Sequence, residues 1–162
     1  PLEILLTMLG KSCPDSSLFG GKKGLLIATY KQLAFEHVQQ LERRNVSPNN
    51  LGDEPLSTIT DDYFKAIIRA VLDDQMDLVR VQIDSNLSVS RQTLEQLTKL
   101  KNLKKPSAEI KSAVAIAMVV EFGLASMEKY IDEVLEMSVN DKKVFMKYFF
   151  EARELGIIKV LK

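Results

Sequence analysis

The segment 107–123, SAEIKSAVAIAMVVEFG, is the feature that most constrains the fold of this chain. Its longest run without a charge is Ser112–Val120, nine residues, which is shorter than the roughly 18–20 apolar residues that span a bilayer. A strand would need half the segment's length and would hold more β-branched and aromatic residues, whereas alanine favours helix. Ser107 is suited to cap the helix start, and Gly123 to end it. We therefore expect a helix near 108–123 that is apolar on nearly all sides and lies buried at the centre of a water-soluble protein.

The rest of the chain repeats this combination of cap residues and apolar stripes with a period of three to four residues. Ser138 and Asp141 have the spacing of a capping box, and Gly156 is a candidate helix end. The predicted helices cover residues 2–9, 24–44, 61–83 (with a break near Asp73–Asp74), 89–103, 108–123, 127–136 and 139–155. The sequence therefore predicts an all-α fold of about seven helices.

Connections of two to five residues after residue 85 predict antiparallel packing of successive helices. Such an arrangement is an antiparallel bundle or a set of stacked helical hairpins. The second form resembles a HEAT- or armadillo-like superhelix, a likeness of architecture that implies no functional site. We expect residues 1–162 to form a single helical domain, with the loop 45–59 as a candidate subdomain boundary. Because the chain begins at Pro1 without methionine, we also expect it to be a fragment of a larger protein.

Composition excludes several classes of function. The 22 basic residues equal the 22 acidic ones, so no overall charge attracts the molecule to nucleic acid or to an anionic membrane. A single cysteine, Cys13, indicates a reducing compartment, and with only His37 beside it a zinc site of Cys and His ligands cannot form. We expect an intracellular protein, cytoplasmic or nuclear, without a metal, a cofactor or a membrane contact. Common catalytic motifs are absent from the sequence, so we do not expect an enzyme.

The C-terminal part carries more apolar side chains than one core face needs. Methionine and aromatic residues away from the main stripe are typical of adaptable partner surfaces. The predicted contacts are Met146, Phe150, Ile157, Ile158 and Leu161. The sequence thus predicts a helical protein–protein interaction domain, a scaffold or adaptor that docks a partner helix or peptide. The alternative is that these side chains belong to the core, since both surfaces look alike in sequence.

A basic segment supports a second hypothesis. Residues 85–105 contain five basic residues and one acidic residue. The candidate phosphate contacts are Lys99, Lys101, Lys104 and Lys105. They predict a helical nucleic-acid-binding or nucleoprotein-associated domain. Against this, lysines in a last helical turn complement the helix dipole, and the segment lacks aromatic residues for base stacking.

Two further patterns are weaker. Lys22 and Lys23, in a glycine-rich stretch before a helix, could hold an anion, although the stretch does not match a P-loop and a solvated loop has the same composition. Asp73 and Asp77 lie four residues apart on one helical face. They allow a carboxylate-dependent helical enzyme, and a solvated acidic surface is the simpler interpretation.

Overall fold

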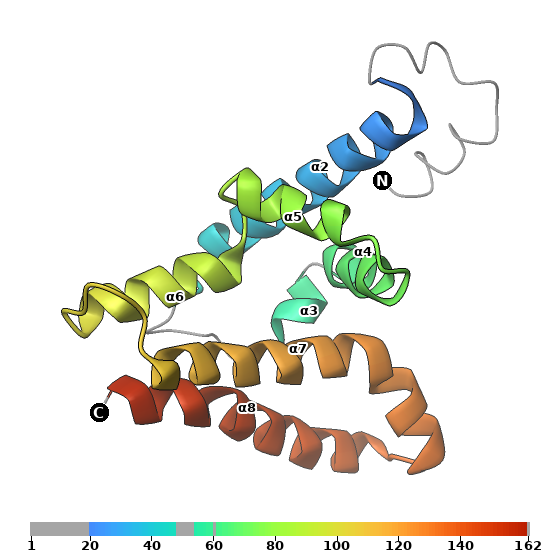
Figure 1. Cartoon of the computed structure of the whole chain (residues 1–162). Coiled ribbons are helices and arrows are strands. Elements are labelled where there is room, and N and C mark those ends of the chain that lie inside the picture. The colour runs from blue at the N-terminus through green and yellow to red at the C-terminus, as the bar shows by residue number, and fades with distance from the viewer. Residues whose placement is uncertain (1–19, 48–53, 60, 162) are drawn as a thin grey trace.

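A computed structural model describes residues 20–47, 54–59 and 61–161 of the chain. Within these residues the regular elements are all α-helices, which confirms the predicted all-α class (Figure 1). The helices are α2 (Gly21–Arg43), α3 (Leu56–Ile59), α4 (Asp61–Leu72), α5 (Met76–Asp84), α6 (Val89–Leu100), α7 (Ala108–Val134) and α8 (Val139–Leu161). The predicted helix 2–9 lies outside the described residues, and the short α3 was not predicted.

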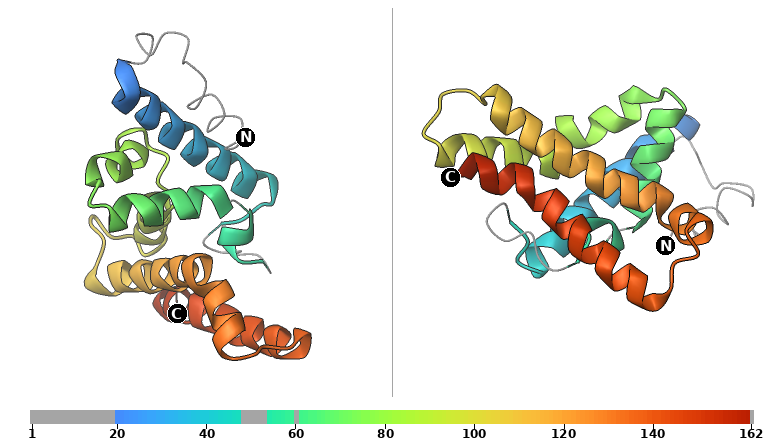
Figure 2. Two further views of the ribbon diagram at one scale, coloured as in Figure 1. Left: turned by 90° about the vertical axis from the view of Figure 1, so that its right-hand side faces the viewer. Right: turned by 90° about the horizontal axis from the view of Figure 1, so that it is seen from below.

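The two long C-terminal helices, α7 and α8, pack against each other as an antiparallel hairpin (Figure 1). The other helices lie on one side of this hairpin. Figure 2 shows α2 farthest from it, with α4 and α5 between, while the α7–α8 turn extends beyond the rest of the molecule. The chain therefore stacks helices in layers, with α7 as the helix that joins the hairpin to the other elements.

Most helices are followed by a residue other than glycine whose backbone has a positive φ, in the left-handed region. In each case the following residue donates a backbone hydrogen bond of 2.7–3.1 Å to the carbonyl five residues earlier, which satisfies an otherwise unpaired helical carbonyl. The left-handed residues are Asn45, Asp74, Asn86, Asn102 and Glu136. Asn and Asp tolerate this conformation better than other residues with a side chain. Asp74 separates α4 from α5, so the predicted break near Asp73–Asp74 is confirmed.

The two glycines that the sequence suggested as helix ends lie inside helices, so those predictions are wrong. α7 continues through Gly123, which merges the predicted helices 108–123 and 127–136. Ser126 lies inside this merged helix and donates its hydroxyl to the carbonyls of Phe122 (2.8 Å) and Gly123 (3.2 Å). α8 likewise continues through Gly156 to Leu161. Glycine only lowers helix propensity, and packing of α7 on α8 outweighs that cost.

The predicted helix starts at Ser107 and Ser138 are confirmed. The Ser107 hydroxyl accepts a hydrogen bond from the Ile110 backbone N–H at 3.3 Å. At the start of α8, the Asp141 carboxylate accepts from the Ser138 N–H (2.9 Å), and the Ser138 hydroxyl accepts from the Asp141 N–H (3.2 Å). This reciprocal pair is the capping box expected from the spacing.

α7 is not buried on all sides, which corrects the expectation of a fully enclosed central helix. One face is covered and contains Ile110, Ala113, Val114, Glu121 and Leu124. On the other face the side chain of Val119 is 71% exposed. α7 also contains an 18-residue window, of mean hydropathy 1.7, that is long and apolar enough to cross a membrane, and 28% of this window is buried. Core helices of soluble proteins can have the same length and composition.

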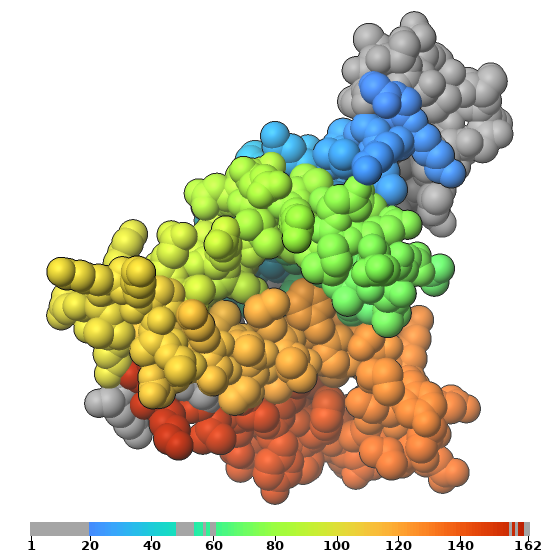
Figure 3. All heavy atoms as spheres, in the orientation of Figure 1, coloured from blue at the N-terminus to red at the C-terminus, as the bar shows by residue number. Residues whose placement is uncertain are grey.

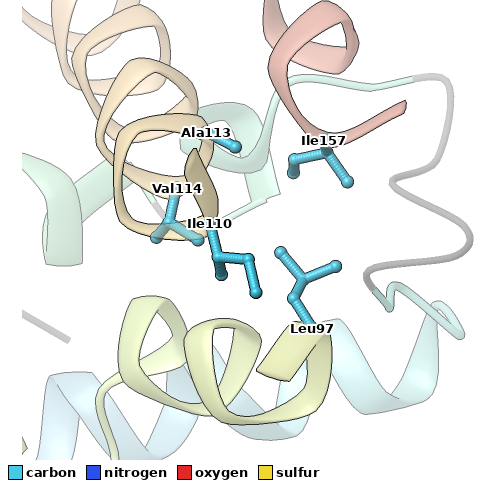
Figure 4. Close-up of a cluster of buried hydrophobic side chains, with 5 residues drawn as sticks. All are labelled: Leu97, Ile110, Ala113, Val114 and Ile157. Carbon is cyan, nitrogen blue, oxygen red and sulfur yellow. The ribbon is translucent and has the colours of Figure 1, made fainter. Parts of the chain in front are cut away.

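Two clusters of buried side chains hold the helices together. The aliphatic cluster joins α6, α7 and α8 through Leu97, Ile110, Ala113, Val114 and Ile157 (Figure 4). The aromatic cluster joins α2 and α4 through Ala34, Tyr63, Phe64 and Ile67, and Phe122 of α7 packs against it. α7 contributes to both clusters, which places its middle part between them.

Candidate functional site

A groove of about 570 Å³ lies between the α4–α5 pair and the partly exposed face of α7. We call it the α4–α7 groove, and Figure 3 shows a hollow between these elements. It is lined by Tyr63, Ile67, Ile68, Val71, Leu72, Met76, Val79, Gln82, Ile83, Ser88, Ser90, Met118, Val119, Phe122, Gly123 and Ser126. None of these 16 residues carries a formal charge. The groove is therefore suited to an apolar surface and unsuited to an ion.

The walls of the groove follow from the spacing of apolar residues. α4 buries Phe64 and Ile67 against α2, and its neighbouring face leaves Leu72 75% exposed. In α7, Val119, Gly123 and Ser126 follow one another at intervals of four and three residues and so lie on one face. Both walls present apolar side chains that no other described helix covers.

Packed aromatic rings form the floor of the groove. The ring of Phe122 lies 5.0 Å from that of Phe64, and Tyr63 stacks on His37 at a centroid distance of 4.3 Å. The Tyr63 hydroxyl donates a hydrogen bond to the Gln82 side-chain carbonyl of α5. Since these contacts connect α2, α4, α5 and α7, the floor is fixed by several elements at once.

An inner cavity of about 70 Å³ lies behind this floor. It shares Tyr63, Ser90, Met118 and Phe122 with the groove, and its far wall contains Glu121 and Arg153. The volume corresponds to about two water molecules at the density of the liquid. The cavity is too small for a large ligand.

The charged side chains behind the cavity form a buried network. Arg153 of α8 is 1% exposed and Glu121 of α7 is 3% exposed. The guanidinium donates to Glu121 Oε1 at 3.1 Å and to the backbone carbonyl of Glu54 at 3.0 Å. Glu121 Oε2 accepts from the backbone N–H of Leu56, the first residue of α3, at 2.9 Å. This network ties α3, α7 and α8 together, and we assign it a structural role.

Burial changes the ionisation of the two rings at the cavity. Loss of hydration lowers the pKa of His37 from 6.5 to about 4, so this imidazole is neutral at pH 7. Burial also raises the pKa of Tyr63 far above its usual value of 10. Both rings are therefore uncharged near neutral pH, which agrees with the apolar character of the groove floor.

The predicted C-terminal contact residues differ in how far their side chains are buried. Met146 is half-buried, and Phe150 is half-buried between the ring of Phe149 (5.5 Å between centroids) and the guanidinium of Arg153 (4.8 Å). Ile157 is 3% exposed and belongs to the aliphatic cluster, so it has to be removed from the predicted contact surface. The side chains of Ile158 and Leu161 lie outside the described part of the structure. The exposed apolar side chains of α8 are instead Val139, Val144, Tyr148 and Leu155.

The predicted nucleic-acid contacts all lie where α6 ends and the turn to α7 begins. Lys99, Lys104 and Lys105 are exposed, and Lys101 is partly exposed. The structure thus brings the four lysines to one end of the molecule, next to the start of α7.

The two weaker candidate sites are engaged in surface ion pairs. Lys23 contacts Asp77 at 2.7 Å, whereas Asp73 contacts Arg69 at 2.7 Å, so the two carboxylates pair with different cations. Lys22 is exposed in the first turn of α2. Within the described residues, His, Cys, Asp and Glu form no group of three or more that could hold a metal ion.

No family model, curated protein or solved structure matches this chain. The function has to be argued from the site itself.

Sequence reasoning missed the α4–α7 groove and the buried ion pair. The groove residues look like core residues of α4, α5 and α7, because exposure depends on which neighbours cover them. The ion pair left a signal: Glu121 is the only charge between Lys111 and Glu128 in an apolar helix. A lone carboxylate at such a position indicates a buried partner.

Proposed function

We propose that this chain is a protein–protein interaction domain of a larger intracellular protein, a scaffold of stacked helical hairpins that docks a partner helix in the α4–α7 groove. The carrying observation is a groove of about 570 Å³ whose lining residues are all uncharged. An amphipathic helix that lays its apolar face into such a groove buries that face without desolvating a charge. The proposal involves no catalytic step.

The geometry favours this groove over the C-terminal contacts expected from the sequence. Phe150 and Met146 are half-buried, and Ile157 is in the core, so little of the described part of that set is accessible. Val119 and Leu72, by contrast, stand on opposite walls of the α4–α7 groove, and both are more than two-thirds exposed. Large exposed apolar side chains on facing walls are typical of a docking surface.

The proposal is tested with a synthetic helical peptide that has leucine on one face and only neutral polar residues on the other. Fluorescence anisotropy measures its Kd for the full chain. Val119→Asp should raise the Kd at least tenfold, about 1.4 kcal/mol, because it places a charge against the apolar face. The matched control is Val144→Asp on α8, which is also exposed and lies outside the groove.

Circular dichroism and thermal melting of both variants verify that the fold is intact. Equal Kd values for Val119→Asp and the wild-type chain would contradict docking in this groove. Concentration-dependent sedimentation of the wild-type chain that Val119→Asp abolishes would assign the groove to a second copy of the chain instead.

A further inference from the structure

A second groove, of about 690 Å³, lies at the end of the molecule where α6 ends, α7 begins and α8 ends. We call it the basic groove. It is lined by Lys101, Leu103, Ser107, Ala108, Glu109, Ile110, Ser112, Ala113, Ile116, Lys159 and Val160. It shares no residue with the α4–α7 groove, so it can be examined separately.

Aliphatic side chains form part of the lining of the basic groove. Ile110 and Ala113 belong to the aliphatic cluster, and Val160 packs against that cluster. Above them Leu103 and Ile116 are about half-exposed. The groove therefore offers a fixed apolar floor with two aliphatic side chains that a ligand can cover.

The groove lies beside a segment rich in lysine. Residues 95–111 contain five lysines and two glutamates, a net charge of +3, and Lys159 of α8 raises it to +4. Among the described residues, none of these six lysines forms an ion pair. Of the two acids, Glu109 accepts a hydrogen bond from the Ser107 hydroxyl, which lowers the pKa of its carboxyl group. Of these charged residues Lys101, Lys159 and Glu109 line the groove itself, a net charge of +1, and the other lysines lie in the neighbouring segment.

The chemistry of the groove favours a peptide over a nucleic acid. Single-stranded nucleic acids are held by aromatic side chains on which bases stack, and none of the lining residues is aromatic. A phosphate backbone would use the lysines but would leave Leu103 and Ile116 without a partner. A segment that carries both aliphatic side chains and carboxylates uses both features of the groove.

We propose that the basic groove binds an acidic amphipathic segment of a partner protein. Its aliphatic side chains lie against Leu103 and Ile116, and its carboxylates face Lys101 and Lys159. The surface lysines steer the segment toward the groove, so the association rate falls as salt concentration rises. The basic groove is a second contact site, and its existence does not depend on docking in the α4–α7 groove.

The test uses a fluorescein-labelled helical peptide with leucine on one face and glutamate on the other, and a control peptide in which every glutamate is replaced by glutamine. Anisotropy with the full chain carrying Val119→Asp, which removes docking of a neutral peptide in the α4–α7 groove, should give a Kd at least tenfold lower for the acidic peptide. This difference should shrink in 0.5 M salt, because the Debye length there is only about 4 Å. Equal Kd values for the two peptides, or no binding of the acidic one, would overturn the proposal.

Variants then locate the binding. Lys101→Gln/Lys159→Gln should raise the Kd of the acidic peptide about tenfold, and Ile116→Asp should raise it as well. The matched control, Lys129→Gln/Lys143→Gln, removes two exposed lysines from the far part of the hairpin and should change the Kd less than twofold. An unchanged Kd in Lys101→Gln/Lys159→Gln would contradict binding of the acidic peptide in the basic groove.

Competitors distinguish other anionic partners. A 20-nucleotide single-stranded DNA or vesicles containing phosphatidylserine should not displace the acidic peptide at equal charge concentration. Stronger binding of either one, lost in Ile116→Asp and in the lysine variant, would replace the peptide with a nucleic acid or a membrane surface. Because the neutral peptide used for the α4–α7 groove reports on Val119, failure of one proposal leaves the other measurable.

Discussion

His37 and Glu121 line the same inner cavity and are both almost completely buried, yet their surroundings differ. His37 lies among the rings of Tyr63 and Phe64, and burial keeps it neutral at pH 7. Glu121 lies opposite a guanidinium and a backbone N–H. On one wall the ionisable group loses its charge, and on the other wall it is paired. The comparison shows two ways in which one small core accommodates polar side chains.

The largest effect is expected from removing one partner of the buried Glu121–Arg153 ion pair. Arg153→Met leaves Glu121 buried without its cation and should lower the free energy of unfolding by about 3–5 kcal/mol. Urea unfolding followed by circular dichroism measures the loss. Adding Glu121→Leu to Arg153→Met should recover most of it, because no charge is then left in the core. A loss below about 1 kcal/mol in Arg153→Met would mean that water reaches this wall.

The neutral state of His37 is tested by measuring how the stability of the fold depends on pH. The unfolded chain binds a proton at His37 near pH 6.5, whereas the folded chain does so only near pH 4. The folded state is therefore favoured above pH 6.5, and the contribution of His37 to stability falls progressively between pH 6.5 and 4, by about 3 kcal/mol in total.

The measurement is the urea midpoint as a function of pH, compared with that of His37→Phe. This variant keeps an aromatic ring against Tyr63 but cannot titrate, so its curve should be flatter over this pH range. Parallel curves for the two proteins would contradict a neutral, buried His37.

A smaller effect is expected at the ring that covers His37. Tyr63→Phe removes the hydrogen bond to Gln82 and should cost about 1 kcal/mol in unfolding free energy. It should leave the pH dependence of stability unchanged, because the ring against His37 remains. A shift of that pH dependence in Tyr63→Phe would show that the hydroxyl, and not burial, controls the imidazole.

The smallest effect concerns the ring beside Arg153. The Phe150 ring lies 4.8 Å from the guanidinium carbon, a cation–π contact. A double-mutant cycle of Phe150→Leu and Arg153→Met should give a coupling energy of about 0.5–1 kcal/mol. Additive losses would show that the charged wall relies on Glu121 and on the backbone carbonyl of Glu54 alone.

The helical class and several helix boundaries follow from local rules and could be predicted. Ser107 and Ser138 cap helices because the bonds that they form lie within one turn of the chain. The two aspartates at 73–74 marked the break between α4 and α5 for a similar reason: Asp74 takes up the left-handed conformation by itself.

The remaining features depend on contacts that are distant in sequence. Whether Gly123 ends a helix is decided by the packing of α7 on α8, which outweighs the propensity of one residue. Which face of α7 is covered depends on where α4, α6 and α8 lie. The α4–α7 groove and the Glu121–Arg153 pair could not be predicted for the same reason, since each joins segments that are distant in sequence: α4 and α5 with α7, and Glu121 with a residue 32 positions later.

The passage of α7 through Gly123 without interruption has a mechanical consequence. Its 27 residues form one continuous helix that bends in its last part (Figure 1), with the hairpin turn at one end and the basic groove at the other. Because the helix bends without being interrupted, the turn and the covered part of α7 belong to one element, and the buried Glu121 lies near the middle of its sequence. A displacement of the hairpin turn would therefore act on the helix that carries the Glu121–Arg153 pair.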